Sequence, residues 1–359
     1  METGREAAQG VAGGVTVSRG TRTLDLPAPL RIVHMERDGW QKAVAAESFD
    51  ALMARDPAAL HAFSLNGDLL WTVQTWCRLR EAGYGGIELA VQPAPGRINM
   101  AKSKVWSRLG RPAECFAVSI QADYPRVLWA QFHIQQNRDL VEADGAYQTL
   151  WPQAAIVPRD RERPVRRVGF LGKLDGNLAL NEAEWTRLLA ERGLEFVARP
   201  ADQWNDFSDI DIALGIRDFS HRRHSHKPPN KLLNAWIAGV PFVGGRDSAF
   251  CQVGTPGEDY LRAITLEDAL LALEHLRDDA ALYHRLVEAG GRRAKAFSTP
   301  AIVREWVRNF EGPIALRYRE WAAHRGKERV RSAALGAAQR AVDAAKAIGR
   351  TLLGREYEA

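Results

Sequence analysis

The sequence of 359 residues lacks the short patterns by which many nucleotide and catalytic sites are recognised. No Gly-x-Gly-x-x-Gly follows its first predicted strand, and it contains neither a P-loop nor a Gly-x-Ser-x-Gly elbow. These absences argue against a dinucleotide-binding oxidoreductase domain, a P-loop NTPase and an α/β-hydrolase.

Cysteine is scarce, and long apolar runs are missing. The three cysteines (Cys77, Cys115 and Cys251) are odd in number and far apart, which predicts free thiols in a reducing compartment and no disulfide or zinc framework. No apolar run approaches the roughly 18 residues that span a bilayer. The first residues have no apolar core of the signal-peptide type. We therefore expect a cytoplasmic protein.

The composition otherwise fits a soluble protein with two domains. Hydrophobic residues make up 46% of the chain and charged residues 26%, which is enough for a sizeable core. A chain of this length usually forms two domains. The net charge of +5 suits an anionic substrate or an acidic membrane surface. This excess is too small to indicate nucleic acid, so no nucleic-acid partner is predicted.

The first half of the chain predicts a parallel α/β unit. The helix expected over Leu69–Ala82 has apolar residues at helical spacing, and Gly83 ends it. Strands separated by helices or crossovers favour a parallel, doubly wound sheet. Buried strands are predicted at 30–35, 61–65, 87–93, 114–122 and 126–137.

The same pattern begins again after a segment rich in Pro, Arg and Asp near residues 156–167. Strands are predicted at 168–172, 194–200, 209–217 and 241–245, with amphipathic helices after 264. The expected division is a flexible leader (1–28), an N-terminal Rossmann-like domain (29–160), a C-terminal Rossmann-like domain (161–312), and a closing helix with a basic amphipathic tail (313–359).

The stretch Lys227–Ala249 is the most informative part of the chain. Prolines at 228 and 229 predict a helix that starts after them with Asn230 as N-cap, and Gly239 ends it in a left-handed conformation. Lys227 and Lys231 flank the start of this helix, where backbone N–H groups favour a phosphate. The alternative is an ordinary αβ unit whose basic residues are only solvated.

Ligands of open parallel sheets bind beyond the carboxyl ends of the strands, so the loops there are the candidate sites. The loop from Arg217 to Lys231 concentrates cations that suit a diphosphate. Its three histidines (His221, His224 and His226) lack nearby carboxylates, and we reject a metal site there. Asp68 is the best candidate for a general base, or else it caps the helix that follows it.

The tail from 325 to 359 predicts a basic amphipathic helix. Such a helix can lie on an anionic membrane surface or pack on the protein or a partner. Its predicted apolar stripe comprises Val330, Ala334, Ala338, Ala341, Ala345, Ile348 and Leu352. Because most of the stripe is alanine, its hydrophobic drive is small.

The segments KPPNKLLNAWIAGVPFVGG, RDSAF and ITLEDALLALEHLRDDAALYHRLVEAG resemble the nucleotide-sugar-binding domain of GT-B glycosyltransferases. The resemblance covers about residues 165–312. It implies an α/β GT-B fold, in which two Rossmann-like doubly wound parallel-sheet domains face a cleft, here with a C-terminal helical tail. It also implies transfer of a sugar from a nucleotide-sugar donor to a saccharide or lipid-linked saccharide, as in cell-envelope polysaccharide biosynthesis.

The resemblance also assigns roles to the candidate residues. Asn234, Asp247 and Ser248 would contact the nucleoside or sugar, and Asp68 and Asp123 would lie on the acceptor side. No metal cofactor is expected, because basic groups would neutralise the phosphates. The residues that would hold the diphosphate are Gly172, Lys173, Arg217, Lys227 and Lys231.

One departure from the family pattern concerns stereochemistry. His226 and Asn234 stand where many retaining members have two glutamates, so both retention and inversion remain open. A nucleotide-sugar epimerase or hydrolase, or a non-catalytic saccharide- or membrane-binding protein, are the alternative functions on such a scaffold.

Overall fold

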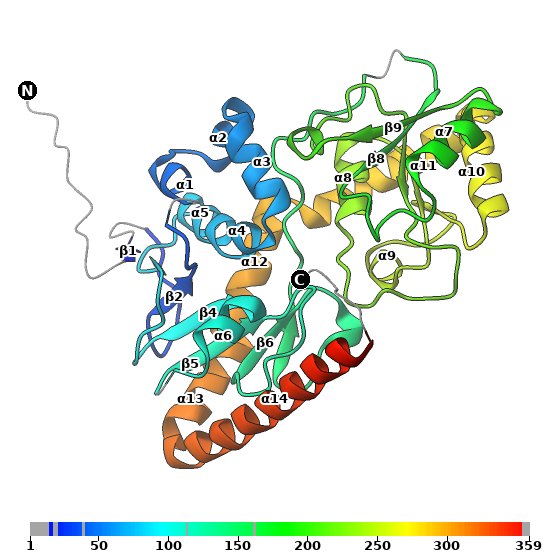
Figure 1. Ribbon diagram of the computed structural model, residues 1–359. Coiled ribbons are helices and arrows are strands. Elements are labelled where there is room, and N and C mark those ends of the chain that lie inside the picture. Colours follow the sequence, from blue (N-terminus) through cyan, green and yellow to red (C-terminus); the bar gives the residue numbers. More distant parts are fainter. Residues whose placement is uncertain (1–13, 17–20, 38–39, 113, 161–162, 354–359) are drawn as a thin grey trace, which may run out of the picture.

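Two parallel sheets organise the computed structural model (Figure 1), which describes residues 14–16, 21–37, 40–112, 114–160 and 163–353. The first sheet has the order β1-β3-β2-β4-β5-β6-β7, in which β1 pairs antiparallel with β3 and the other neighbours are parallel. Its strands are β1 (Gly14–Thr16), β2 (Leu30–Val33), β3 (Glu88–Ala90), β4 (Ile98–Lys102), β5 (Phe116–Ile120), β6 (Phe132–Gln135) and β7 (Gly145–Tyr147).

Short helices accompany the first sheet. Strands β4, β5 and β6 are buried along their whole length, as strands covered on both faces must be. The helices are α1 (Gln41–Ala45), α2 (Phe49–Arg55), α3 (Pro57–Leu65), α4 (Gly67–Trp71), α5 (Val73–Glu81), α6 (Ser103–Leu109) and the 3-10 helix η1 (Arg138–Leu140).

The second sheet is entirely parallel, with the order β12-β11-β10-β8-β9. Its strands are β8 (Arg167–Leu171), β9 (Glu195–Arg199), β10 (Ile212–Gly215), β11 (Phe242–Gly244) and β12 (Leu261–Arg262). Its helices are α7 (Glu182–Ala190), η2 (Ala201–Gln203), α8 (Asn230–Ala238), α9 (Ser248–Val253), α10 (Leu266–Asp278) and α11 (Ala280–Ala294). The prediction of two parallel α/β units is confirmed.

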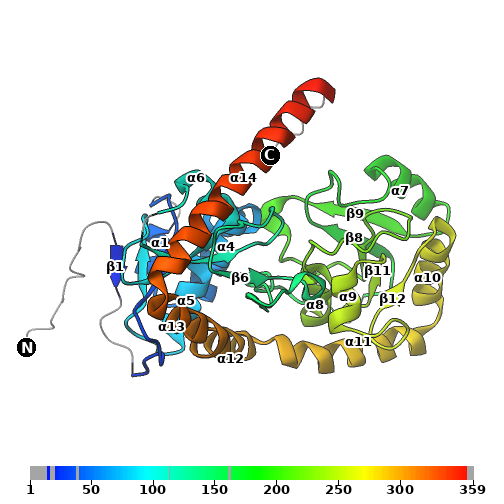
Figure 2. The same ribbon diagram turned by 90° about the horizontal axis from the view of Figure 1, so that it is seen from below.

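A run of helices returns from the second sheet to the first (Figure 2). After η3 (Lys295–Phe297) come α12 (Thr299–Asn309), the π-helical turn η4 (Phe310–Ile314) and α13 (Ala315–Ala323). Trp306 of α12 packs edge-to-face on Trp71 at 6.1 Å, and Tyr318 of α13 lies 5.2 Å from Phe116. The returning helices thus belong to the core of the first sheet, although the exact domain limits stay a prediction.

Two sequence predictions in the first half are wrong. Residues 61–65 were expected to form a strand but lie in α3, because Asp56 accepts a hydrogen bond from the Ala59 N–H and Pro57 occupies the first turn. Strand β4, over Ile98–Lys102, was not predicted. The helix expected over 69–82 is present as α4 and α5, which are separated at Thr72.

The segment 1–28 also departs from a flexible leader where it is described. Strand β1 pairs with β3 through Val15 and Leu89, and the side chains of Leu24 and Leu26 pack against the first core. Residues 1–13 and 17–20 lie outside the described part of the chain.

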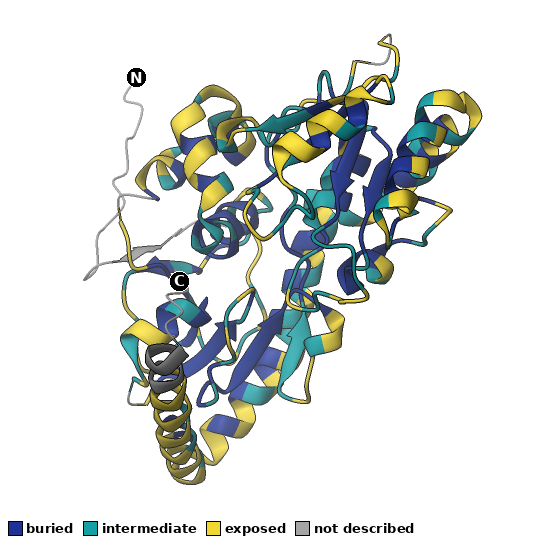
Figure 3. Cartoon of the chain, turned by 45° about the vertical axis from the view of Figure 1, so that its right-hand side comes forward, coloured by how far each residue is buried: buried dark blue, intermediate teal, exposed yellow. Residues whose placement is uncertain are grey.

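The tail forms one long helix, α14 (Arg325–Leu353), whose first half packs on the first sheet and whose second half extends beyond it (Figures 2 and 3). The packed face differs from the predicted stripe. Ser332 Oγ donates to the Trp129 carbonyl, and Gln339 Oε1 accepts from the Leu128 N–H at 3.0 Å. Val330, on the predicted stripe, is 71% exposed. Side chains beyond residue 346 lie outside the described part.

Alanine substitutions at two neighbouring glycines of α11 test how this helix packs against α8. A Cβ on Gly290 would overlap the Trp236 ring, whereas a Cβ on Gly291 would meet no atom within 4 Å. We expect Gly290→Ala to lower the free energy of unfolding by about 1–3 kcal/mol. Gly291→Ala should leave it unchanged or raise it by about 1 kcal/mol, because alanine favours the helix. Urea unfolding of both variants measures this, and equal effects would contradict the packing.

Candidate functional site

Charged side chains meet at the carboxyl edge of the second sheet. Arg217 follows β10 and Asp247 follows β11, and Arg217 Nε donates to Asp247 Oδ2 at 2.7 Å. Both side chains are almost fully buried. Arg217 also donates to Asn177 Oδ1. The guanidinium is therefore held in one orientation at the point where β8, β10 and β11 end.

Lys231, in the first turn of α8, brings a second cation to this edge. Its Nζ lies 4.8 Å from the centre of the Phe170 ring. A Cβ on Gly172, which follows β8, would stand 2.7 Å from the same Nζ, so only glycine leaves room for this approach. Burial, followed by repulsion from Arg217, lowers the pKa of Lys231 from 10.5 to about 7. Among the described residues, the amine has no hydrogen-bond or carboxylate partner.

The start of α8 differs from the prediction in one respect. Asn230 is the first residue of the helix and not its N-cap; Pro229 holds the cap position, with no side-chain hydrogen bond to the helix. Asn230 Nδ2 donates instead to the Trp151 carbonyl at 2.6 Å. Gly239 ends the helix in the left-handed conformation, as predicted. The N–H groups of the first turn of α8 consequently have no side-chain cap.

The loops after β5 and β6 of the first sheet reach this edge. Asp123 Oδ2 accepts from Lys227 Nζ at 3.2 Å, and its other oxygen accepts from Gln136 Nε2 at 2.6 Å. Asn137 Nδ2 donates to Ser248 Oγ at 2.9 Å. The structure thus brings together three predicted site residues, Asp123, Lys227 and Ser248. The sequence analysis did not single out Gln136 or Asn137, although their place at the end of a strand is the signal that could have found them.

The side chains of two predicted residues are not joined to this cluster by a hydrogen bond or an ion pair among the described residues. Asn234 Oδ1 accepts from the Gln153 N–H at 2.9 Å, so the side chain fixes the segment that joins the two sheets. Its only acceptor oxygen is therefore engaged within the protein. Lys173 is exposed, and no side chain of the described residues pairs with its ammonium. Their assignment to the site therefore stays a prediction.

Asp68 lies on the first sheet within a separate polar group. Its carboxylate forms an ion pair with Lys102 Nζ at 2.6 Å. Asn66, and not Asp68, is the N-cap of α4, because Asn66 Oδ1 accepts from the N–H groups of Asp68 and Leu69. The alternative that Asp68 caps the helix is therefore wrong, and the carboxylate is held by Lys102, whose ammonium also lies 4.9 Å from the Tyr124 ring.

His34, at the carboxyl end of β2, was missed by the sequence analysis. The Thr72 hydroxyl donates to the Asp68 carbonyl and lies 3.0 Å from His34 Nδ1. Because that hydroxyl proton is already used, His34 Nδ1 must carry the proton and donate to Thr72. Nε2 is then an acceptor, and it is buried without a partner. Burial lowers the pKa of His34, which keeps the ring neutral.

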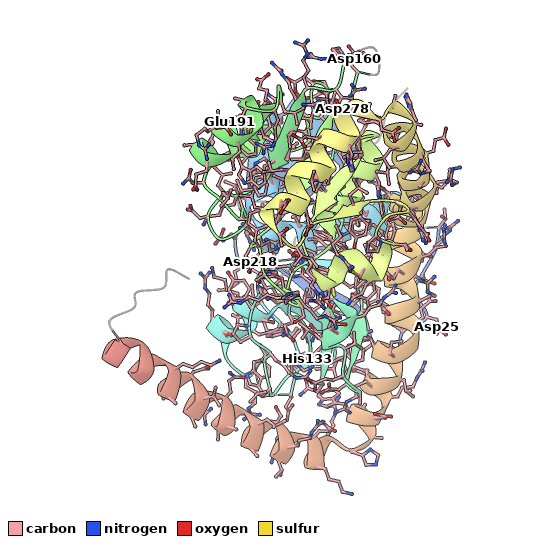
Figure 4. The ribbon with its side chains drawn as sticks, turned by 90° about the vertical axis from the view of Figure 1, so that its right-hand side faces the viewer. Asp25, His133, Asp160, Glu191, Asp218 and Asp278 are labelled. Carbon is pink, nitrogen blue, oxygen red and sulfur yellow. The ribbon has the colours of Figure 1, made fainter. Side chains whose placement is uncertain are left out.

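The histidines of the basic loop do not gather around one point that could hold a metal. His224 Nε2 lies 3.1 Å from the carboxylate of Asp218, which is labelled in Figure 4, and His221 Nδ1 contacts Arg246. Within the described ranges, no group of three or more His, Cys, Asp or Glu side chains could bind a metal ion. In the same part of the chain, no helix is both long and apolar enough to cross a membrane.

Comparison with known proteins returned structural likenesses only. No protein-family profile matches the chain, and neither does any curated protein sequence. The structure is similar to HepE from Anabaena in complex with UDP and glucose (10% identity, TM-score 0.39), over 54% of this chain and 71% of HepE.

Two further solved structures show the same kind of likeness. A variant of S. aureus TarM in a complex with UDP is 9% identical over 60% of this chain and 55% of TarM, with a TM-score of 0.44. Sucrose-phosphate synthase from Thermosynechococcus elongatus is 13% identical over 77% of this chain and 80% of the synthase, also with a TM-score of 0.44.

The buried amine of Lys231 makes stability depend on pH. Between about 7 and 10.5 the unfolded chain binds one proton more than the folded chain, so the free energy of unfolding rises with pH, by at most about 1.4 kcal/mol per pH unit. Below this window the penalty for the buried charge is fully present. Lys231→Met should therefore stabilise the protein more at about pH 6.5 than at about pH 9.5.

Urea unfolding at the two pH values measures the difference between the variant and the parent protein. Lys173→Met, which removes an exposed ammonium, is the matched control and should show a difference that does not change with pH. A pH-independent difference for Lys231→Met as well would show that its pKa is not lowered.

Proposed function

We propose that the protein is a GT-B-type glycosyltransferase that takes a sugar from a nucleotide-sugar donor. The observation that carries the proposal is the unpaired amine of Lys231 beside Gly172 and Arg217 at the carboxyl edge of the second sheet. A diphosphate there would raise the pKa of Lys231 and receive charge-assisted hydrogen bonds from it. The same groups would neutralise the charge that develops on the departing nucleoside diphosphate.

The donor would lie between the two sheets. Asp247 and Ser248 follow β11, and Lys227 and Ser248 contact residues of the first sheet. Gly172, Lys173, Arg217, Lys227 and Lys231 are proposed to hold the phosphates. Lys173, which is exposed, would reach them only with its flexible side chain, and Asn234 would have to release Gln153 to contact the ribose.

On the acceptor side, we propose His34 as the proton acceptor, together with Asp68. The neutral Nε2 of His34 has no partner among the described residues and would accept a proton from a sugar hydroxyl once acceptor binding uncovers it, whereas Asp68 already forms an ion pair with Lys102. Asp123 would then position the acceptor or the Lys227 ammonium. A base in this place is compatible with direct displacement and inversion at the sugar carbon.

The finer features of the proposal are the acceptor and the cellular setting. A saccharide or lipid-linked saccharide of cell-envelope polysaccharide biosynthesis is the proposed acceptor, in line with the family resemblance. The reaction is proposed to be independent of metal ions, because Lys231 and Arg217 stand where a cation would otherwise neutralise the diphosphate. Attachment of α14 to an anionic membrane surface stays a prediction of the sequence.

Donor binding is tested with a panel of nucleoside diphosphates by calorimetry, without and then with a chelator. Lys231→Met should weaken the binding of the preferred nucleotide about tenfold or more, because one charge-assisted hydrogen bond is lost. Gly172→Ala should also weaken it, by displacing the amine. Arg222→Ala, which removes an exposed cation of the same loop, is the control and should bind as the parent does. Unchanged affinity in Lys231→Met, or loss of binding on adding the chelator, would contradict the proposal.

The acceptor side is tested by transfer of labelled sugar from nucleotide sugars to saccharide and lipid-linked acceptors. His34→Gln should lower kcat about 100-fold or more with little change in the donor KM, because general-base catalysis contributes about that much. Asp68→Asn should have a smaller effect on kcat but should lower the melting temperature, because it leaves the buried Lys102 ammonium without its carboxylate. Full kcat in His34→Gln would exclude it as the base.

The same assay without acceptor separates the alternative functions. A transferase should leave most of the donor intact, whereas an epimerase or hydrolase would convert it. A non-catalytic relative would show neither transfer nor conversion.

A further inference from the structure

A cavity of about 240 Å³ lies between the first sheet and the corner where α13 meets α14. Figure 1 shows this corner beside β5, below the first sheet. The sheet side of the cavity includes Cys115 and Gln131, which directly precede β5 and β6. The proposed transfer site lies at the opposite ends of these strands, near Gln136. The cavity is therefore separate from that site, and the inference drawn from it does not rest on the proposed function.

Three arginines line this cavity, and none of them has a carboxylate partner within the described part of the chain. Arg111 comes from the loop before β5, and Arg325 and Arg329 come from the first turns of α14. The two α14 residues are four positions apart, so they share one face of the helix with Ser332, which packs on the sheet. The three arginine side chains thus line one space from two different elements, and the stem of Arg111 also packs along α14 beside Gly336.

The carboxylates of the cavity wall do not cancel this charge. Glu328 accepts from Arg317 at 2.8 Å and lies 3.9 Å from Arg331, so two arginines outside the cavity already neutralise it. Glu114 is exposed and is a single carboxylate against three guanidinium groups. Guanidinium groups recognise phosphate through paired N–H donors, which makes a phosphate the matching anion.

The volume of the cavity and its apolar wall indicate which group the ligand carries besides the phosphate. A volume of 240 Å³ corresponds to roughly eight water molecules at about 30 Å³ each, which is more than one phosphate group fills. Trp321 and Pro112 supply an apolar wall, and Arg325 already lies over the Trp321 ring at 4.9 Å. A flat ring can be held in the same way, between the apolar wall and a guanidinium plane.

We propose that this cavity is a binding site for a small phosphate ester with a flat apolar ring, held by Arg111, Arg325 and Arg329. The phosphate lies against Arg325 and Arg329, which are one turn apart on α14, Arg111 adds positive charge from the loop side, and the ring lies against Trp321 and Pro112. Because α13 and α14 form one wall, the bound ligand ties the start of the long C-terminal helix to the first sheet.

Phenyl phosphate is the probe, and its binding to the full chain is measured by calorimetry. The double variant Arg325→Gln/Arg329→Gln should weaken the binding at this cavity at least tenfold, because two charge-assisted interactions are lost. Arg329→Lys, which keeps the charge but not the paired donors, should fall between the double variant and the parent. Arg319→Gln, an exposed arginine of α13 that does not line the cavity, is the matched control and should bind as the parent does.

The Lys231→Met variant separates this site from the proposed donor site. If the cavity binds the probe, Lys231→Met retains the arginine-dependent binding. Phenyl phosphate binding that is lost in Lys231→Met and unchanged in the double variant would support the donor site and overturn the cavity site. Absence of arginine-dependent binding at millimolar probe would overturn it as well. The substituted arginines are exposed, so the melting temperatures of the arginine variants should match that of the parent.

Discussion

The buried amine of Lys231, close to Arg217, is the feature on which the candidate site depends. An ammonium group without a carboxylate partner is unfavourable where water is partly excluded, and its lowered pKa expresses this penalty. The fold nevertheless makes room for it, since Gly172 has no side chain to displace it and Asp247 neutralises the neighbouring Arg217. This arrangement lowers the stability of the folded protein when no anion is bound. A bound anion would neutralise the ammonium and remove the penalty.

The parallel strands explain why these groups meet. All five strands of the second sheet point in the same direction, so the residues that follow β8, β10 and β11 come to one edge. The loops that follow β5 and β6 of the first sheet reach the same edge. There Asp123 contacts Lys227 and Asn137 contacts Ser248. Side chains from both sheets therefore surround the proposed donor position, while the cavity under α14 lies at the other end of the first sheet.

The sequence predicted most of this arrangement, because buried strands and glycine-ended helices leave local signals. It failed where distant contacts decide the outcome. Residues 61–65 resemble a strand, but the cap at Asp56 commits them to α3. Asn234 occupies a position that the family resemblance assigns to the donor, yet its oxygen is engaged by Gln153. The role of His34 depends on Thr72, 38 positions away. In α14, alanines on several faces gave no strong preference for one, and Ser332 and Gln339 form the packed face instead.

The most direct test of the account is a crystal structure of the protein with the nucleoside diphosphate that it binds best. The account predicts that the diphosphate lies at the carboxyl edge of the second sheet, within hydrogen-bond distance of Lys231 Nζ and close to Arg217 and the first turn of α8. A nucleotide bound elsewhere, with Lys231 still unpaired, would contradict it.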